Sequence, residues 1–365
     1  MPIKPEGDKL FDENLQNSFL FEDFYHSNNF PNPQYLGCKQ RLLPWIFSFV
    51  PKDAETFFDA FAGSQSVAFE AKKRNYKVYS NDFMSFSNQI GKSLIENSSE
   101  KLSKNDLQIL FSKNENKGDL IQKLFENVFF VKQDAEFLDN FRANVNLLKG
   151  EYKKNLALAS MNRALTRKTI MGHFAHMQAL NYANNPERIK RNPTIARNVE
   201  DLFIDLVVKY NSAIFDNGKE NKSFQGDVLE ILPKLKDVDL VYFDPPYCGS
   251  HSDYQSFYHL LETFTEYWTD KKFVNKNNKY FPLRKSGFDK KGEIINSLEK
   301  MMEKSKHIKY VLISYNDRSY PKIDDFINLI KKYRNEVELF EKSYENSRGG
   351  KGSVKGSKEY IIRCK

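Results

Sequence analysis

Short apolar runs alternate with helix-like segments in the first part of the chain. Residues 56–61 have the pattern of a buried strand, a turn containing Gly63 leads into a helix over 68–73, and residues 77–80 form the next strand. A strand, a helix and a second strand in this order are typical of a parallel sheet whose faces are covered by helices. The pattern therefore predicts an α/β fold.

The strand pattern stops near residue 98 and returns at residues 222–224. Between them the chain is rich in Ser, Asn and Lys around helical segments. We therefore predict three parts: an N-terminal arm (1–30), an α/β domain (31–97 and 222–365) and an inserted, mainly helical domain (98–221). The α/β domain should hold further strands at 239–243, 310–314 and 359–363.

The composition is that of a folded protein of the reducing cytoplasm. Thirty-one Phe and nineteen Tyr supply far more apolar surface than a disordered chain holds. The three cysteines are far apart and the histidines lack metal-ligand spacing, so we expect no disulfide framework and no metal site. The sequence shows no secretion signal and no apolar run of membrane-spanning length, which predicts a cytoplasmic protein without a membrane partner.

Charge indicates a polyanionic partner. The chain has 56 basic and 48 acidic residues, a net charge of +8. A modest excess of this kind is also common on ordinary solvated surfaces, so local support is needed. Residues 160–198 supply it, with one acid, Glu187, among seven basic residues that we predict to bind DNA: Arg163, Arg167, Lys168, Arg188, Lys190, Arg191 and Arg197.

The strongest chemical signal is the string Asp244-Pro245-Pro246-Tyr247, which follows the apolar run 241–243. A buried parallel strand delivers its last side chains to the edge where open α/β sheets bind ligands. Two prolines remove two backbone donors and stiffen the turn. The string therefore predicts a rigid group of hydrogen-bond acceptors beside an aromatic ring, although a strand-end Asp before a tight turn is the plain structural alternative.

That arrangement suits methylation of a planar aromatic amine. The lone pair of such an amine is delocalised into its ring, so it attacks a methyl group only after acceptors have redirected it. If Asp244 and the carbonyl of Pro245 each accept an N–H, the nitrogen can aim its lone pair at an electrophilic methyl group. Tyr247 would stack on the base, and about 1–3 kcal/mol of stacking offsets much of the cost of extruding a base from a duplex.

Three blocks in this order resemble a known family: residues 35–39 (Tyr-Leu-Gly-Cys-Lys), residues 59–64 (Asp-Ala-Phe-Ala-Gly-Ser) and the Asp244 string. They are similar to the Dam-like class of bacterial and phage adenine-N6-specific DNA methyltransferases, in which a target recognition domain lies between the cofactor motifs and the catalytic loop. The resemblance covers roughly residues 33–90 and 222–365. It implies a Rossmann-like S-adenosylmethionine-dependent methyltransferase fold with an inserted helical target recognition domain.

The resemblance also implies an activity. The enzyme would transfer a methyl group from S-adenosyl-L-methionine to a flipped-out adenine at a specific site in double-stranded DNA. It would be the modification enzyme of a restriction-modification system, with a cognate restriction endonuclease as partner. Asp244, Pro245, Pro246 and Tyr247 would be its catalytic residues.

The same resemblance assigns the cofactor site. Asp59 would accept from the methionine ammonium group of the cofactor, and Gly63 would allow its close approach. Lys39, with Tyr35 and Gly37, would hold its carboxylate. Independently, an acid after the second strand of nucleotide-binding α/β folds holds ribose hydroxyls, which indicates that role for Asp82. The remaining predicted cofactor residues are Asp227, for the adenine amino group, and the pocket neighbours Phe61, Phe83 and Val228.

Two positions depart from the family pattern. Gln65 stands where a second glycine is usual, which predicts a wider turn, and Cys38 replaces a usual small residue. Asp134 lies in a segment similar to that of Asp227 but is worse placed, so we interpret it as structural. Lys39 taken alone would be an ordinary surface lysine.

Other substrates are open to such a site: cytosine N4, an RNA adenine or a protein glutamine. Asp244 favours adenine, because cytosine-N4 enzymes more often resemble Ser-Pro-Pro and glutamine enzymes resemble Asn-Pro-Pro. The basic insertion favours DNA over protein, but no motif excludes RNA. A catalytically inactive DNA-binding relative is the alternative from another class, and binding of S-adenosylmethionine would distinguish it.

Overall fold

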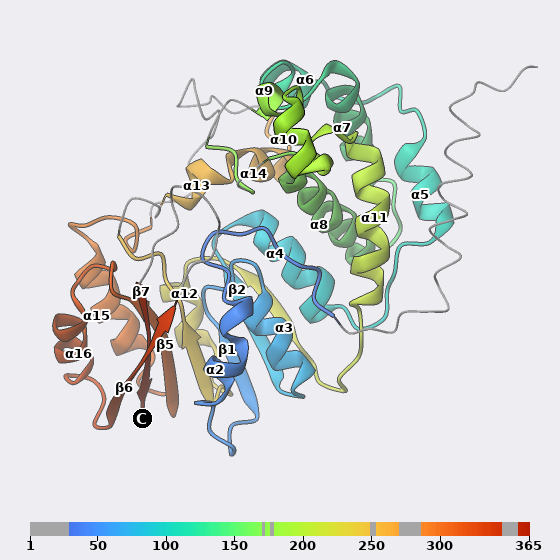
Figure 1. Ribbon diagram of the computed structural model, residues 1–365. Coiled ribbons are helices and arrows are strands. Elements are labelled where there is room, and N and C mark those ends of the chain that lie inside the picture. Colours follow the sequence, from blue (N-terminus) through green and yellow to red (C-terminus); the bar gives the residue numbers. More distant parts are fainter. Residues whose placement is uncertain (1–28, 170–171, 176–178, 249–252, 270–285, 345–356) are drawn as a thin grey trace, which may run out of the picture. The chain divides into compact units, whose positions relative to one another are not determined.

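The computed structural model describes residues 29–169, 172–175, 179–248, 253–269, 286–344 and 357–365. Their contacts divide the chain into two compact units. The helical unit consists of the described residues of Met1–Leu36, Lys92–Asp216 and Ser256–Phe281. The sheet unit consists of those of Gly37–Gly91, Asn217–Gln255 and Pro282–Lys365 (Figure 1).

The sheet unit confirms the predicted α/β fold. Its sheet has seven strands in the order β3-β2-β1-β4-β5-β7-β6. The strands are β1 (Thr56–Asp59), β2 (Lys77–Asp82), β3 (Lys222–Gln225), β4 (Leu240–Phe243), β5 (Tyr310–Asn316), β6 (Val337–Tyr344) and β7 (Ser357–Cys364). All six predicted strands are present, with bounds that differ by a few residues at most.

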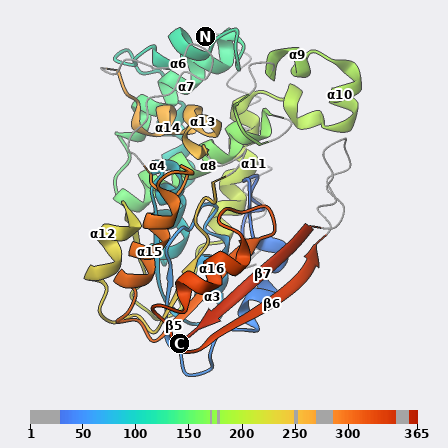
Figure 2. The same ribbon diagram turned by 90° about the vertical axis from the view of Figure 1, so that its left-hand side faces the viewer.

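The sheet is parallel only in part, which corrects the prediction of a parallel sheet. β1 to β5 pair in parallel, whereas β7 is antiparallel to both β5 and β6. β6 was not predicted from the sequence, because charged residues interrupt its apolar positions and Leu339 is exposed. β6 forms the end of the sheet and pairs along its length with β7 (Figure 2).

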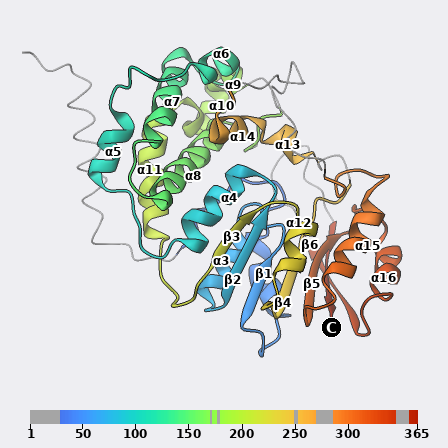
Figure 3. The same ribbon diagram turned by 180° about the vertical axis from the view of Figure 1, so that it is seen from behind.

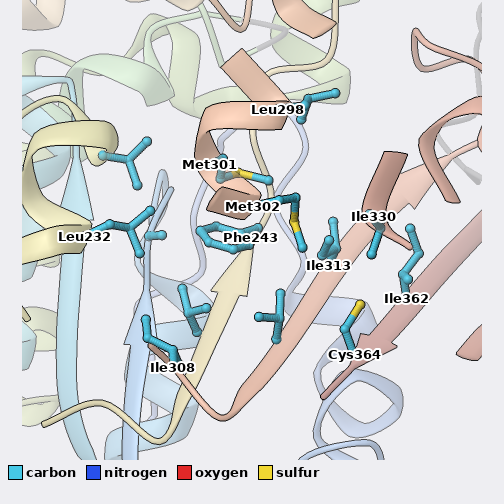
Figure 4. Packing of buried hydrophobic residues seen from close by; sticks show 14 of the residues in the cluster. Leu232, Phe243, Leu298, Met301, Met302, Ile308, Ile313, Ile330, Ile362 and Cys364 are labelled. Carbon is cyan, nitrogen blue, oxygen red and sulfur yellow. The ribbon is translucent and has the colours of Figure 1, made fainter. Parts of the chain in front are cut away.

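One face of the sheet packs into an apolar core. Phe243, Ile313 and Ile362 come from adjacent strands, and Met301 and Met302 come from the helix that covers them (Figure 4). Side chains alternate along a strand, so the neighbours of these residues face the other side of the sheet. The helical elements of the sheet unit are η1 (Gln40–Leu42), α2 (Leu43–Phe47), α3 (Ser66–Lys73), α4 (Ser85–Gly91), α12 (Val228–Ile231), η4 (Leu232–Lys234), α15 (Ile294–Lys304) and α16 (Ile323–Ile330).

The helical unit is built around three helices that contact one another, α7 (Lys132–Val145), α8 (Glu151–Arg167) and α11 (Val199–Ser212) (Figure 3). Phe141 and Phe203 join α7 to α11 with ring centroids 4.8 Å apart. The other elements of this unit are the π-helix η2 (Lys92–Glu96), α5 (Lys104–Phe111), α6 (Leu120–Phe125), α9 (Ala179–Ala183), α10 (Pro186–Arg191), η3 (Pro193–Ala196) and α14 (His259–Glu266). The short helix α13 (Tyr254–Phe257) spans the change from the sheet unit to the helical unit.

The contacts group some residues differently from the predicted domain boundaries. Residues 92–97 and 256–269, which the sequence places in the α/β domain, cluster with the helical unit. Arg142 donates to the carbonyl oxygens of Phe264 and Thr265, and Asn162 donates to the Thr265 hydroxyl. These bonds attach α14 to α7 and α8. The division into catalytic and target recognition domains stays a prediction, and the predicted N-terminal arm lies almost wholly outside the described residues. Among the described helices, none is long and apolar enough to cross a membrane.

Candidate active site

Acidic side chains meet at the carboxyl edge of the parallel strands. Asp59 and Asp82 are the last residues of β1 and β2, and Asp244 follows β4 directly. The strand register places Asp59 beside Tyr242, opposite to the face that holds Phe243. This is the edge at which open α/β sheets bind ligands, as the sequence predicted.

Asp59 is held as a buried acceptor with one oxygen to spare. Its side chain is 1% exposed, and Oδ2 accepts from the backbone N–H of Ala68 at 3.0 Å. Oδ1 is buried and accepts no hydrogen bond from any described residue. Burial, and next the negative charge of Asp244, raise the pKa of Asp59 well above its usual range. A cationic donor group would satisfy Oδ1 and stabilise the ionised carboxylate.

Asp82 shapes the turn after β1. One carboxylate oxygen accepts from the backbone N–H of Gly63 at 2.7 Å, and the other accepts from that of Met84 at 2.8 Å. Burial raises the pKa of Asp82 to about 6, against the lowering effect of these bonds. Each oxygen has a second lone pair, so the predicted ribose contact is compatible with this role and stays a prediction.

The predicted wider turn at Gln65 is wrong. The backbone N–H of Gln65 donates to the Ala62 carbonyl at 2.6 Å, and Gln65 adopts the left-handed φ of 65°. A glycine reaches this conformation without strain, whereas glutamine does so at a cost. Its buried side chain donates to the carbonyl and hydroxyl of Ser87, at 3.2 and 3.3 Å. The side-chain bonds thus maintain a tight turn without the second glycine.

This geometry makes Gln65→Ala less stable than Gln65→Gly. Both changes remove the bonds to Ser87, but only alanine keeps the left-handed strain. We expect the free energy of unfolding of the alanine variant to be lower than that of the glycine variant by about 1–2 kcal/mol. Urea denaturation measures the difference. An alanine variant as stable as the glycine variant would show that the backbone strain is absent.

Asp244, in the predicted catalytic loop, forms an ion pair that the sequence did not suggest. Lys39 Nζ lies 2.7 Å from Asp244 Oδ2, and also donates to the Gly37 carbonyl at 3.3 Å. Burial raises the pKa of Asp244 above its usual range, and Lys39 opposes this shift. Burial alone would lower the pKa of Lys39, but the charges of Asp244 and Glu359 outweigh it and raise that pKa. Lys39 is therefore a permanent cation at this site, not a surface lysine.

Tyr247 is fixed by the neighbouring strand. Its hydroxyl donates to the Ser314 carbonyl, and its ring lies edge-on to that of Tyr315 with centroids 4.4 Å apart. The Ser314 hydroxyl is also 2.5 Å from that of Tyr242. No role was assigned to Ser314 and Tyr315 from the sequence, because the pairing of β5 beside β4 depends on distant segments. Together these contacts hold the ring of Tyr247 in one orientation.

Two further residues near the loop were missed. A β-carbon added at Gly37 would lie 3.2 Å from the hydroxyl oxygen of Tyr254. Burial, and next the negative charge of Asp244, raise the pKa of Tyr254 to about 12. Glu359, on β7, interacts electrostatically with both Lys39 and Asp244. Glu359 lies far from the predicted motifs in the sequence, whereas Tyr254 lies seven residues after Tyr247.

The other predicted cofactor residues lie in several different parts of the structure. Asp227 caps α12, with Oδ1 accepting from the Leu229 N–H at 2.9 Å, and Val228 is buried. The ring of Phe61 packs against the apolar core beside Phe288. Phe83 is partly buried directly after Asp82. Tyr35 belongs to the helical unit and stacks on the ring of Tyr258 with centroids 4.9 Å apart. Their cofactor roles stay predictions.

Comparison with known proteins decides between the substrates left open by the sequence. Residues 35–329 match the family of D12 class N6 adenine-specific DNA methyltransferases. The chain belongs to this family. It is an adenine-N6 DNA methyltransferase, and its Rossmann-like sheet is the fold predicted for that class.

Several methyltransferases are similar to it over most of its length. Type II methyltransferase M2.HphI of Haemophilus parahaemolyticus is 32% identical over 86% of this chain and 91% of its own. Modification methylase StsI of Streptococcus sanguinis is 27% identical, and type II methyltransferase M.FokI of Planomicrobium okeanokoites is 25% identical. Each of these two matches covers 82% of this chain but only 46% and 47% of the relative, respectively.

The sheet edge fits the methyl-donor cofactor that a methyltransferase needs. The spare buried oxygen of Asp59 calls for a hydrogen-bond donor, and Gly63, with a left-handed φ of 47°, has no side chain that could obstruct a ligand in the turn after β1. Lys39 offers a cation for an anionic group of such a ligand. No group of three or more potential metal ligands occurs among the described residues.

Two of the predicted DNA-binding residues form hydrogen bonds or ion pairs within the methyltransferase itself. Arg163 donates to the Asn32 carbonyl at 2.9 Å and to Gln34 at 3.1 Å, and burial lowers its pKa to about 10. Lys168 is 9% exposed, donates to the Arg197 carbonyl and pairs with Asp134 at 3.2 Å. Asp134 is structural, as predicted, and these two cations are built into the helical unit.

The remaining basic residues of the insertion are accessible. The helix α10 carries Arg188, Lys190 and Arg191. It has no buried residue, and it contacts α9 (Figure 2). Arg197 pairs with Asp205 at the surface, and Arg167 is partly buried. α10 therefore provides the densest exposed positive charge among the residues predicted to bind DNA.

Proposed function

We propose that the methyltransferase uses S-adenosyl-L-methionine to methylate a flipped-out adenine in double-stranded DNA. The observation that supports this most strongly is the acceptor geometry at the sheet edge. Asp244 directly follows β4, Asp59 ends the adjacent strand β1 with an unsatisfied buried oxygen, and the negative charge of Asp244 acts on Asp59. One acceptor suits the amine of the substrate and the other suits the ammonium group of the donor.

The donor supplies an electrophilic methyl group on a sulfonium sulfur. In this proposal Asp59 accepts from its ammonium group, Lys39 holds its carboxylate and Asp82 accepts from its ribose hydroxyls. Asp227 has one carboxylate oxygen that accepts from Leu229, which leaves the other for an adenine amino group. The backbone at Gly37 and Gly63, with the neighbouring side chains of Phe61, Phe83 and Val228, would complete the pocket.

The catalytic loop orients the amine. Asp244 and the Pro245 carbonyl would each accept one N–H of adenine N6 and thereby direct its lone pair to the methyl group. Pro246 stiffens the turn, and the fixed ring of Tyr247 offers a face on which the extruded base can stack. S-adenosylmethionine would supply the methyl group, and Asp244, which accepts an N–H of the amine, would be placed to take up the proton that the nitrogen loses.

Donor binding and strand dependence test this proposal. Calorimetric titration with S-adenosylmethionine should show saturable binding without DNA, whereas ATP should not bind. Transfer of labelled methyl groups should occur to native genomic DNA and fall strongly on heat-denatured DNA or on RNA. Failure to bind S-adenosylmethionine would contradict its assignment as the methyl donor. Stronger labelling of RNA than of native DNA would contradict the assignment of double-stranded DNA as the substrate.

Exposed cations of α10 should contribute to DNA affinity. Changing Arg188, Lys190 and Arg191 together to glutamine removes three charges without disfavouring the helix. DNA affinity should fall, and the slope of log affinity against log salt should become shallower by about 0.9 for each phosphate that the helix no longer neutralises. The same change at Lys306, Lys331 and Lys332, three exposed lysines of the sheet unit, is the matched control. Unchanged affinity and slope in the α10 variant would remove this helix from the DNA interface.

The type II names of several relatives support a place in a restriction-modification system. In this proposal the enzyme protects its recognition site from a cognate endonuclease, which is a partner in function. DNA methylated by the enzyme should then resist that endonuclease, while unmethylated DNA is cut.

A further inference from the structure

Glu359 lies at the catalytic edge of the sheet although it is far from every motif in sequence. β7 runs antiparallel to β5, so the beginning of β7 lies beside the end of β5, and Glu359 pairs with Asn316. Two residues further along, Ser314 pairs with Ile361 on the same face. That face also carries Tyr242, whose hydroxyl reaches Ser314. The register therefore places the Glu359 side chain on the face and edge that hold the catalytic loop.

Lys39 is shared between two acids at this edge. Its ammonium lies 2.7 Å from Asp244, and the charges of both Asp244 and Glu359 act on it. Burial raises the pKa of the hydroxyls of Tyr242 and Tyr247, and the negative charge of Glu359 adds to this shift. One cation thus faces two carboxylates, one from the catalytic loop and one from β7.

The observed ion pair makes Asp244 a weaker acceptor for the N–H of adenine N6. Oδ2 already accepts from Lys39, and a neighbouring cation withdraws negative charge from the carboxylate. An adenine amine needs a free and strongly accepting oxygen. Each carboxylate oxygen has a further lone pair, so contact with Lys39 does not block the amine, but Asp244 becomes a stronger acceptor if Lys39 moves toward another anion as the substrate enters. A buried ammonium that loses its partner needs another.

We propose that Glu359 is a positioning residue that holds the ammonium of Lys39 while Asp244 accepts the N–H of the target adenine. This inference rests on the proposed role of Asp244. An ammonium has three N–H donors, so Lys39 can bind Glu359 and the carboxylate of the methyl donor at the same time. Glu359 thereby acts on the reaction through Lys39, without touching the substrate.

The role requires that Glu359 be ionised. Burial raises the pKa of Glu359 to about 7, against the lowering effect of Lys39 and with the charges of Asp244 and Asp317 adding to it. Glu359 also interacts electrostatically with the hydroxyls of Tyr242 and Tyr247. At a pH below about 7 Glu359 takes up a proton and releases Lys39 to Asp244. The kcat of the wild-type enzyme should therefore fall on the acid side with an apparent pKa near this value.

The test compares kcat and KM from pH 6 to 9 for the wild type, Glu359→Gln, Glu359→Asp and the control Glu341→Gln. Glu341 is an exposed acid of β6 that pairs with Lys358. We expect Glu359→Gln to lower kcat by about 10- to 100-fold, which is the effect of losing one charge-assisted hydrogen bond. The KM for DNA and the KM for S-adenosylmethionine should change little. It should also remove the acid limb of the pH profile. Glu359→Asp should restore part of the rate, and Glu341→Gln should match the wild type.

Folding is checked separately. Glutamine replaces an acid that is disfavoured in its ionised form, so the thermal unfolding midpoint of Glu359→Gln at pH 8 should equal or exceed that of the wild type. A folded Glu359→Gln enzyme with the rate and pH profile of the wild type would overturn the inference and leave the proposed function intact. Absence of methyl transfer by the wild type itself would instead contradict the proposed function.

Discussion

Replacing Asp244 with alanine is expected to lower kcat for methyl transfer by about 10²- to 10³-fold or more, with DNA affinity unchanged within a few-fold. The carboxylate accepts from the amine most strongly as the nitrogen becomes nucleophilic, so its loss raises the energy of the transition state more than that of the bound substrate. Single-turnover methylation measures the rate, and a filter-binding assay measures DNA affinity.

Asp324→Ala provides the control for this prediction. Asp324 is an exposed acid of α16 in the same unit, so its loss removes one charge without touching the sheet edge. Calorimetric binding of S-adenosylmethionine by Asp244→Ala shows that the variant has folded. Substantial turnover by a folded Asp244→Ala enzyme would refute the catalytic assignment.

Asp59→Asn is expected to weaken donor binding and to stabilise the free protein. Loss of one charge-assisted hydrogen bond to the ammonium should raise the dissociation constant for S-adenosylmethionine by about 10- to 100-fold. The pKa of Asp59 is raised in the folded state, so its ionisation costs folding stability as the pH rises through the unfolded value toward the folded one. Asparagine removes that cost, so the unfolding midpoint at pH 8 should increase.

These opposite effects separate a binding role from a structural one. A merely structural Asp59 would give lower stability and lower affinity together. Asp53→Asn, which alters an exposed ion pair with Lys309, should leave donor affinity unchanged. Normal donor binding by Asp59→Asn would remove this residue from the cofactor site.

The sequence predicted the sheet well where strands are short, buried and parallel. It could not show the reversal at β7, because strand direction depends on how distant segments pair. β6 was missed because an edge strand is solvated and its alternation is interrupted by charges. The placement of α14 with the helical unit depends on its bonds to α7 and α8, which no local pattern reveals.

The site was predictable where a motif supplies both residue type and position, as for Asp59, Asp82 and Asp244. Ser314 and Glu359 were missed because they approach the loop only through the order of the strands. The wider turn expected from Gln65 in place of glycine is absent, because a buried side-chain contact to Ser87 maintains the tight turn. Lys168 and Lys190 look alike in the sequence, yet one is buried against Asp134 and the other is exposed.

Methyl transfer from labelled S-adenosylmethionine to unmethylated genomic DNA tests the central claim most directly, when the product nucleosides are separated and the modified positions are sequenced. N6-methyladenine within one short, fixed sequence is the expected result. Label recovered as N4-methylcytosine, or recovered only in RNA, would contradict the assignment of Asp244 to an adenine in DNA.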